Sequence, residues 1–192
     1  MRAYLLKIKD SSRDIYTLQR AVCNAGRGSF QLEMRLSPGR YCLMLGAFAA
    51  DPSQENLEKK YSVIVHSTTD LQELNEFQRE SAEKIMGGVL SNLSSRKGES
   101  TALVADNSVR RYCYPSRRMG LCIISYVNRS PSFYNVVDEM DVKGIYLSNK
   151  NLDEGRLRIS LPPNSKRLVV FRYEEGSGFE LAILRTAIAI RT

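Results

Sequence analysis

The chain has 192 residues, of which 43% are hydrophobic and 26% are charged, and its formal net charge is +7. This composition is typical of a soluble globular protein, and the lack of a run of about 18 apolar residues excludes a transmembrane helix. Segment 1–12 has charges where a signal peptide needs its apolar stretch, so we expect a cytoplasmic protein.

The first third of the chain alternates as strands do. Apolar side chains recur at every second residue in Tyr4, Leu6 and Ile8 and again through 30–36, which places one face of each strand on a core. Ser37-Pro38-Gly39 predicts a tight reversal between two strands, because Pro presets the first turn torsion and Gly accepts a positive φ. The predicted strands are 3–8, 15–23, 30–36, 41–48 and 61–65.

The pattern changes to a helical period after His66. Apolar residues at helical spacing run from Ala82 to Leu93, and either Asn75 or Ser81 is a suitable N-cap. Gly87-Gly88 weakens the middle of this helix by roughly 1 kcal/mol per glycine relative to alanine. We therefore expect a helix that survives by packing, as the connector of two β-modules.

The last third again consists of short strands separated by turn residues. Pro162-Pro163 ends one strand, and the GSG at 176–178 predicts a hairpin loop. The predicted strands are 101–106, 109–114, 121–128, 134–137, 144–147, 156–161, 167–173 and 179–188. The predicted fold is mainly β, with two small antiparallel β-sandwich modules joined by a connecting α-helix: a partial sandwich over 1–69, the helix and a loop over 70–98, and a second sandwich over 99–192.

Residues able to perform catalysis are sparse. Cys23, Cys42, Cys113 and Cys122 form no CxxC pair, and three of them lie in apolar runs, which is typical of buried structural thiols. His66 is the single histidine, and nothing in the spacing brings a cysteine to it as a nucleophile–base pair would require. We expect no catalytic residue, metal ligand or cofactor, and therefore not an enzyme.

Carboxylates occur in two groups that the pattern assigns to loops. Asp138, Glu139 and Asp141 form one group, and Asp153 and Glu154 form the other. They are either solvated turn acids or oxygen ligands for calcium at the end of a sandwich, although their spacing matches no EF-hand.

The excess positive charge is dispersed, and it favours an acidic partner without choosing one. Tyr112, Tyr114 and Tyr173 lie beside arginines, but strand alternation would turn the tyrosines inward and the arginines outward, so no specific nucleic-acid motif is indicated. Local basic pairs are either a solvated rim that keeps strand edges soluble or a docking face. The candidate partner-binding residues are Arg110, Arg111, Arg117, Arg118, Lys166 and Arg167.

Several segments resemble the calpain family in their order. LSPGRYCLMLGAF at 36–48 is similar to a strand, turn and strand of the calpain β-sandwich. The segments VHSTTDL (65–71), GLCIISYVNR (120–129), GIYL (144–147) and LPPNSKRLVVFRYEEGSGFELAILR (161–185) resemble the C-terminal extension of the small-optic-lobes (calpain-15) branch. The protease core that supplies Cys, His and Asn in that family has no counterpart here, so no catalytic residue is carried over.

The resemblance implies a non-catalytic β-sandwich protein whose first sandwich begins partway through. We expect a protein-interaction or scaffold module in a larger assembly such as the cytoskeleton. Two alternatives stay open: a regulatory or targeting segment of a calpain-type cysteine protease, and calcium-tuned, weak binding to an anionic membrane surface.

Overall fold

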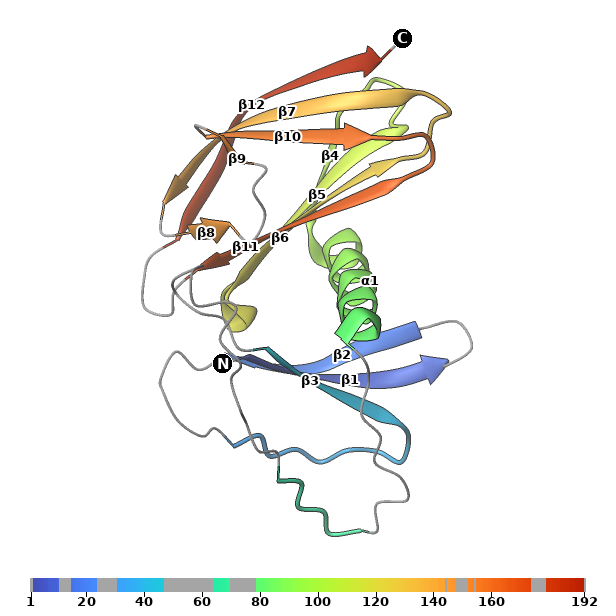
Figure 1. Ribbon diagram of the computed structural model, residues 1–192, viewed down its shortest axis with the longest axis vertical. Helices are drawn as coiled ribbons and strands as arrows, with labels where there is room; N and C mark the ends of the chain where they lie inside the picture. Colours follow the sequence, from blue (N-terminus) through green and yellow to red (C-terminus); the bar gives the residue numbers. More distant parts are fainter. Residues whose placement is uncertain are drawn as a thin grey trace.

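The structure is a computed structural model that describes residues 2–10, 15–23, 31–46, 64–69, 79–143, 145–147, 152–153, 155–173 and 179–191. Within these residues the protein is mainly β, with three small antiparallel sheets and one long helix (Figure 1). In the same part of the chain, no helix is both long and apolar enough to cross a membrane.

The N-terminal sheet has the strand order β2-β1-β3, formed by β2 (Ile15–Cys23), β1 (Arg2–Asp10) and β3 (Tyr41–Gly46). Leu6 of the central strand is paired with Leu18 on one side and Cys42 on the other, and it is fully buried. The turn at Ser37-Pro38-Gly39 is present as a bend, and the Tyr41 hydroxyl donates a 2.7 Å hydrogen bond to the Ser37 carbonyl.

Two predicted strands are not strands where the structure describes them. Residues 31–36 and 64–65 have no strand assignment, and Leu36, Ile64 and Val65 are exposed. A strand is held by the ladder it shares with a neighbour, and none of the described sheets includes these residues. The prediction of strands from apolar alternation is therefore wrong at these positions.

Helix α1 (Arg79–Lys97) buries Ile85, Val89 and Leu90 on one stripe, as the helical spacing predicted. The predicted N-cap Asn75 lies outside the described residues. At its other end the Gly98 amide donates a 2.8 Å hydrogen bond to the Ser94 carbonyl. A Cβ at Gly98 would lie 2.5 Å from that carbonyl oxygen and 2.9 Å from the Cys113 carbonyl oxygen, so only glycine permits this approach to the next sheet.

The five-stranded sheet has the order β4-β5-β6-β11-β8. Its strands are β4 (Glu99–Ala102), β5 (Val109–Ser116), β6 (Leu121–Asn128), β11 (Lys166–Tyr173) and β8 (Ile145–Leu147). The short 3₁₀ helix η2 (Arg117–Met119) joins β5 to β6, and Gly120 ends it in the left-handed conformation at φ 61. The strand predicted at 101–106 starts earlier and stops at Ala102, because Asn107 at φ 60 turns the chain.

The four-stranded sheet has the order β12-β7-β10-β9. Its strands are β12 (Glu180–Arg191), β7 (Phe133–Lys143), β10 (Arg156–Leu161) and β9 (Leu152–Asp153). β7 is far longer than the predicted 134–137, because β12 and β10 pair with it along its length. The hairpin loop predicted at 176–178 lies outside the described residues, but the flanking strands β11 and β12 belong to different sheets and so do not pair as a hairpin.

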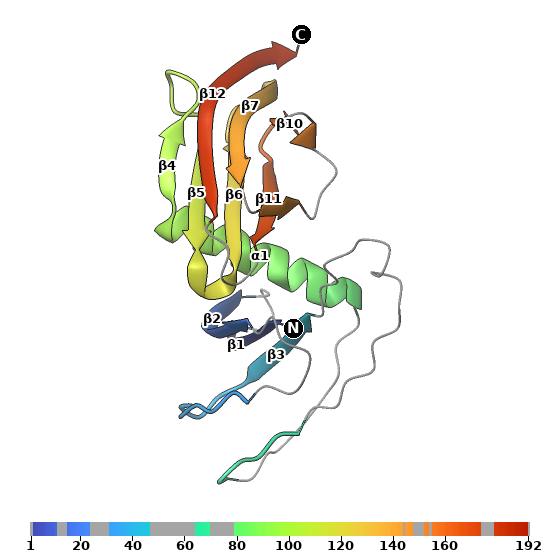
Figure 2. The ribbon, with the colours of Figure 1, turned by 90° about the vertical axis from the view of Figure 1, so that its left-hand side faces the viewer.

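Two buried apolar clusters share strand β6. Cys122, Ile124 and Tyr126 belong to the first cluster, which joins residues of the five-stranded and four-stranded sheets. Leu121 and Ile123 belong to the second, which joins the five-stranded sheet to α1, η2 and the N-terminal sheet. All eight residues of β6 are buried, as a strand covered on both faces requires. Figures 1 and 2 show α1 lying between the N-terminal sheet and the five-stranded sheet.

Candidate functional site

The candidate basic residues whose side chains the structure describes are spread over the five-stranded sheet and η2 and do not form one patch. Arg110 and Lys166 are both in register with Val127, so they lie in one row across β5, β6 and β11, roughly 10 Å apart at two strand spacings. Lys166 is exposed, whereas the Arg110 guanidinium donates to Ser100 Oγ at 3.2 Å and to Asn107 Oδ1 at 3.1 Å. Arg111 and Arg167 are both in register with Tyr126, so they share the next row, on the opposite side of the sheet.

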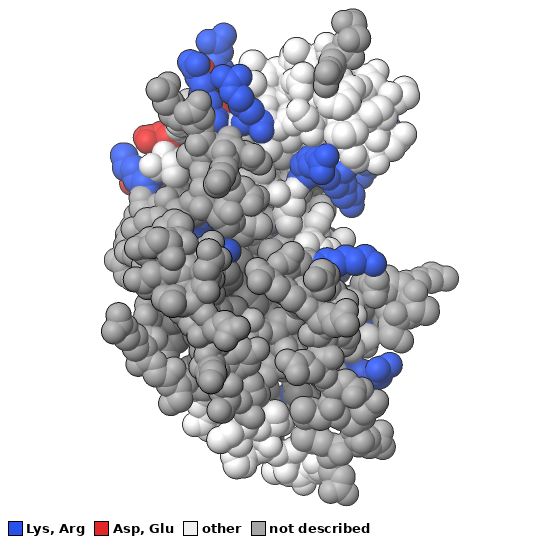
Figure 3. All heavy atoms as spheres, in the orientation of Figure 1, with Lys and Arg blue, Asp and Glu red and all other residues white. Residues whose placement is uncertain are grey.

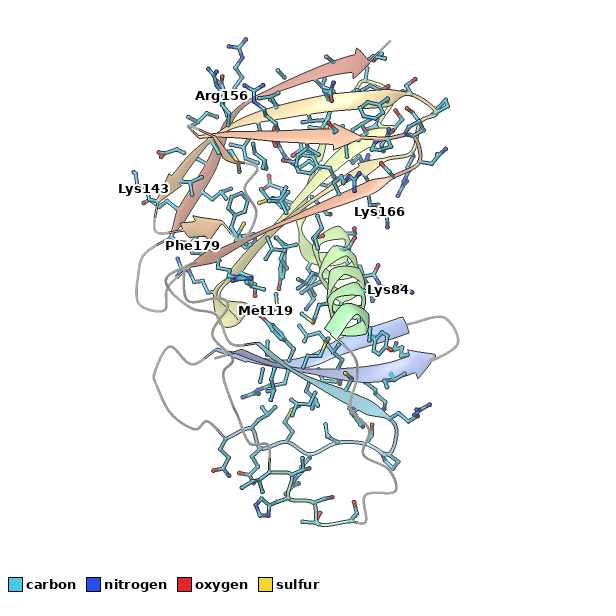
Figure 4. All side chains as sticks on the ribbon, viewed as in Figure 1. Lys84, Met119, Lys143, Arg156, Lys166 and Phe179 are labelled. Carbon is cyan, nitrogen blue, oxygen red and sulfur yellow. The ribbon has the colours of Figure 1, made fainter. Side chains whose placement is uncertain are left out.

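The other candidates lie elsewhere. Arg117 is exposed on η2, at the end of β5 opposite Arg110 and roughly 20 Å from it at the rise of a strand. Arg118 follows it in η2, but its side chain lies outside the described residues. Arg167 is exposed at the start of β11, where its Nε donates to the Ser160 carbonyl at 3.4 Å. Figure 3 shows basic side chains in separate groups along the right edge and at the upper left, and in the same orientation Figure 4 labels Lys166 on the right and Arg156 and Lys143, which are not candidates, at the upper left.

Arg111 is in the interior rather than on the surface. It is 8% exposed and faces the four-stranded sheet, so the expectation that arginines of this strand point outward is wrong at this position. The neighbouring Tyr112 is half-buried, and Tyr114 packs against the second cluster instead. The physical reason is that Arg111 forms an ion pair with a buried carboxylate between the two sheets. Arg111 is therefore not part of a docking face.

That carboxylate is Asp138 on β7, which is fully buried. Its Oδ1 accepts hydrogen bonds from Arg111 Nη1 at 2.8 Å and from Thr186 Oγ1 of β12 at 2.6 Å. Its Oδ2 accepts one from the Tyr126 hydroxyl of β6 at 2.5 Å. We call these four residues, Arg111, Tyr126, Asp138 and Thr186, the Asp138 cluster. Arg111 Nη1 also donates to Thr186 Oγ1 at 2.8 Å, so the cluster joins β5 and β6 of one sheet to β7 and β12 of the other.

The electrostatics of the cluster favour a fixed ion pair. Burial, together with the negative charge of Asp138, raises the pKa of the Tyr126 hydroxyl, which therefore remains a neutral donor. Each oxygen of the Asp138 carboxylate has a donor, as a buried charge requires. With these bonds made, the arrangement supplies a structural link between two sheets.

The sequence offered a signal for Asp138 that the loop interpretation missed. Tyr134, Val136, Asp138 and Met140 stand at every second residue and are all buried, so the aspartate occupies an apolar face of a strand. The prediction that Asp138, Glu139 and Asp141 lie on a loop is therefore wrong, because all three belong to β7. Thr186 carried no comparable signal, since it lies in an alternating run with small apolar neighbours.

The remaining acids give no calcium site in the described residues. Glu139 is paired with Arg156 at 3.3 Å, and Asp141 lies 3.9 Å from Lys143, which also binds Glu180 at 3.2 Å. Asp153 lies in β9, whereas Glu154 is outside the described residues. Among the residues that the structure describes, no three His, Cys, Asp or Glu side chains lie together as potential metal ligands.

A cavity of about 440 Å³ lies between the start of β12 and the neighbouring strands. It is lined by Cys113, Pro115, Cys122, Asp141, Phe179, Glu180, Leu181 and Ala182. We call it the thiol cavity, because Sγ of Cys113 and Sγ of Cys122 are 3.9 Å apart in its wall. Both thiols are free, as is the buried Cys42. His66 is exposed at 64–69 and is not among the residues that line this cavity.

Comparison of the chain with protein-family models, with curated proteins and with solved structures found no match.

Proposed function

We propose that this protein is a non-catalytic, calpain-like β-sandwich protein that serves as a protein-interaction or scaffold module in a larger assembly. In this proposal the five-stranded and four-stranded sheets pack face to face as the sandwich, and β12 accepts an extended segment of a partner protein as an additional strand. The observation that carries the proposal is the outer edge of β12, with which no other described strand pairs.

β12 is the longest strand of the four-stranded sheet and stands at its edge. It has 12 residues and, among the described strands, pairs only with β7 (Figure 2). At the opposite edge, β9 has two residues. Natural proteins usually shorten, charge or cover an edge strand, since its unpaired amides and carbonyls can template another chain. A long edge with few charges is the form that strand addition uses.

The exposed side chains of β12 support a docking role. Leu184 is 70% exposed and Ile190 is 61% exposed, and Ala182, Ala187 and Ala189 are exposed as well. A register shift between Ile183 and Arg185 interrupts the ladder, and beyond it Arg185 to Arg191 pair regularly with Glu139 to Phe133. The seven residues that follow the shift form a strand long enough for an added segment to pair with.

The chemistry of this edge defines the partner segment. Apolar side chains are needed against Leu184 and Ile190, and an acidic residue is favoured beside the exposed Arg185. The net charge of +7 likewise favours an acidic partner, through attraction at long range. We therefore propose an extended, acidic segment with alternating apolar residues.

The test captures partners with the immobilised full chain at about 0.15 M salt, where weak long-range attraction is largely screened. We compare the wild type, a Leu184→Glu/Ile190→Glu double variant and an Ile64→Glu control, which changes an apolar side chain that is 77% exposed elsewhere. A discrete partner should be lost from the double variant and retained by the control. Hydrogen exchange of the complex should then show new protection of the amides in 185–191.

The same partner bound equally by all three proteins would contradict docking at β12, and so would protection confined to another strand. A papain-like protease as the lost partner would point to the regulatory alternative. A second copy of this chain would show as a concentration-dependent increase in sedimentation that the double variant abolishes, and it would contradict a hetero-partner.

A further inference from the structure

Cys113 and Cys122 stand on adjacent strands with their sulfurs in contact. Cys113 of β5 is in register with Ile124, and Cys122 of β6 with Pro115, so the two cysteines are diagonal neighbours. Their Sγ atoms are 3.9 Å apart. A disulfide needs a separation of about 2.05 Å, so the sulfurs must approach each other by roughly 2 Å to bond.

The thiol cavity gives a small reagent access to this pair. Its wall is mainly apolar, with Pro115, Phe179 and Leu181, and carries the carboxylates of Asp141 and Glu180. Cys113 is partly exposed, whereas Cys122 is fully buried. In Figure 4, Phe179 lies near the start of β12 and the side chains of the five-stranded sheet. A reagent entering here therefore meets Cys113 before Cys122.

The surroundings give the two thiols opposite acidities. The hydrogen bond from Cys122 lowers the pKa of Cys113, and the Arg111 guanidinium acts in the same direction. Burial and the carboxylates of Glu99 and Asp138 oppose this, but the net shift is downward. The pKa of Cys122 is raised by its donation to Cys113 and by burial, and burial raises the pKa of Cys42 in the N-terminal sheet. Cys113 is therefore the better nucleophile of the three, because the thiolate is the reactive form.

We propose that Cys113 and Cys122 form a peroxide-sensitive dithiol switch, in which Cys113 reacts with a hydroperoxide and Cys122 resolves the product as a disulfide. In the first step Sγ of Cys113 attacks hydrogen peroxide, the O–O bond breaks, and Cys113 becomes a sulfenic acid with release of one water. In the second step Sγ of Cys122 attacks that sulfur, the S–O bond breaks, and the hydroxyl leaves with the Cys122 proton as a second water. The dithiol loses two electrons and two protons, and the peroxide is reduced to two waters.

The diagonal position makes the disulfide reversible. Diagonal neighbours on antiparallel strands are farther apart than a relaxed disulfide prefers, so the bond strains β5 against β6. Strained disulfides have more oxidising potentials and are reduced readily by cellular thiols. The disulfide would strain the wall of the thiol cavity, which both cysteines line. It would also strain β5, which carries Arg111 two residues before Cys113. This inference does not rest on the proposed docking at β12.

The test treats the native full chain with hydrogen peroxide, blocks the remaining thiols and maps the tryptic peptides. Trypsin cleaves after Arg111, Arg117, Arg118 and Arg129, which separates Cys113 (112–117) from Cys122 (119–129). We expect a linked pair of these peptides that is two hydrogens lighter than their sum and is reversed by a thiol reductant. Without peroxide, Cys113 should be alkylated roughly tenfold faster than Cys42. The alkylation rate of each thiol increases with pH, and this increase should occur at a lower pH for Cys113 than for Cys42, because the pKa of Cys113 is lower.

Three variants separate the roles of the two thiols. Cys122→Ala should halt the reaction at a Cys113 sulfenic acid that dimedone traps, and Cys113→Ala should leave Cys122 unmodified at the same peroxide dose. Cys42→Ala, the matched control, should still give the linked peptides. The proposal is overturned if Cys113 is alkylated no faster than Cys42, or if peroxide gives no linked peptide in the wild type. A stable Cys113 sulfenic acid in the wild type would also overturn it, since Cys122 would then not be resolving.

Discussion

The two faces of the five-stranded sheet are built from different chemistry. The face toward the four-stranded sheet carries the Asp138 cluster and the Cys113–Cys122 pair among its apolar residues. The face toward α1 is apolar at Leu121 and Ile123, with one buried polar contact in which Ser94 Oγ donates to Ser125 Oγ at 2.8 Å. Buried polar groups tolerate only arrangements that satisfy them, whereas apolar packing tolerates many. The first face therefore fixes how the sheets align, and the second supplies adaptable packing for the helix.

The largest effect is expected from removing the carboxylate of the first face. Asp138→Ala leaves Arg111 buried without its partner, and losing one partner of a buried ion pair costs about 3–5 kcal/mol. We expect that decrease in the free energy of unfolding, measured by urea denaturation. Asp141→Ala is the matched control on the same strand: its side chain is 53% exposed, and the loss should stay within about 0.5 kcal/mol.

A double replacement of the ion pair sharpens the same comparison. Arg111→Met/Asp138→Leu removes both charges, and we expect it to recover much of the stability lost in Asp138→Ala, because apolar replacement of a buried pair is often close to neutral. The Tyr126 and Thr186 hydroxyls then lose their acceptor, so recovery should be incomplete. A double variant as unstable as Asp138→Ala would show that the loss of stability comes from poor packing at the site and not from the unpaired charge of Arg111.

On the helix face the expected loss is smaller and comes from packing alone. Ile123 is fully buried in the second cluster, and Ile→Ala at such positions costs roughly 2–4 kcal/mol through lost burial and the cavity that remains. Ile123→Val should cost only about 1 kcal/mol. Urea denaturation of both variants tests this, and equal losses would indicate a strained isoleucine instead.

The serine pair of the helix face should contribute about 1 kcal/mol. Ser94 and Ser125 are both fully buried, and each is the other's partner between α1 and β6. A double-mutant cycle with Ser94→Ala and Ser125→Ala should give a coupling energy of roughly 0.5–1.5 kcal/mol. The coupling is reduced because the single hydroxyl proton of Ser94 is shared with the Ser91 carbonyl, whose oxygen lies 2.9 Å from Ser94 Oγ. A coupling energy near zero would show that the hydrogen bond to the Ser91 carbonyl is sufficient for the Ser94 hydroxyl.

The smallest effect is expected at Gly87 of α1, and Gly98 just after the helix provides the contrast. A Cβ at Gly87 meets nothing within 4 Å, so Gly87→Ala should raise the free energy of unfolding by roughly 0.5–1 kcal/mol. Gly98→Ala should lower it, because the added Cβ would lie against two backbone carbonyl oxygens. Thermal unfolding of the two variants should shift in opposite directions. Shifts in the same direction would contradict the close approach of Gly98 to β5.

The sequence predicts where individual strands and helices lie better than it predicts which strands pair with each other. Alternation found β1 and β2, short apolar runs bounded by turn residues found β6 and β10, and helical spacing found α1. Which strands pair is decided by contacts distant in sequence, and so the 176–178 hairpin prediction failed. The interior Arg111 was missed for the same reason: its partner is 27 residues away on β7. The Cys113–Cys122 contact needed the β5–β6 register, which spacing alone does not supply.

Strand β6 has a consequence for how the protein unfolds. Three of its residues belong to the first buried cluster and two to the second, so neither cluster can lose this strand without exposing the other. Two modules joined by an independent linker would melt separately, whereas a shared strand couples their opening into one cooperative transition. The amides of β6 should then be the slowest to exchange with solvent, at a rate set by global unfolding. A destabilising substitution in either cluster should thus lower the free energy of unfolding of both clusters together.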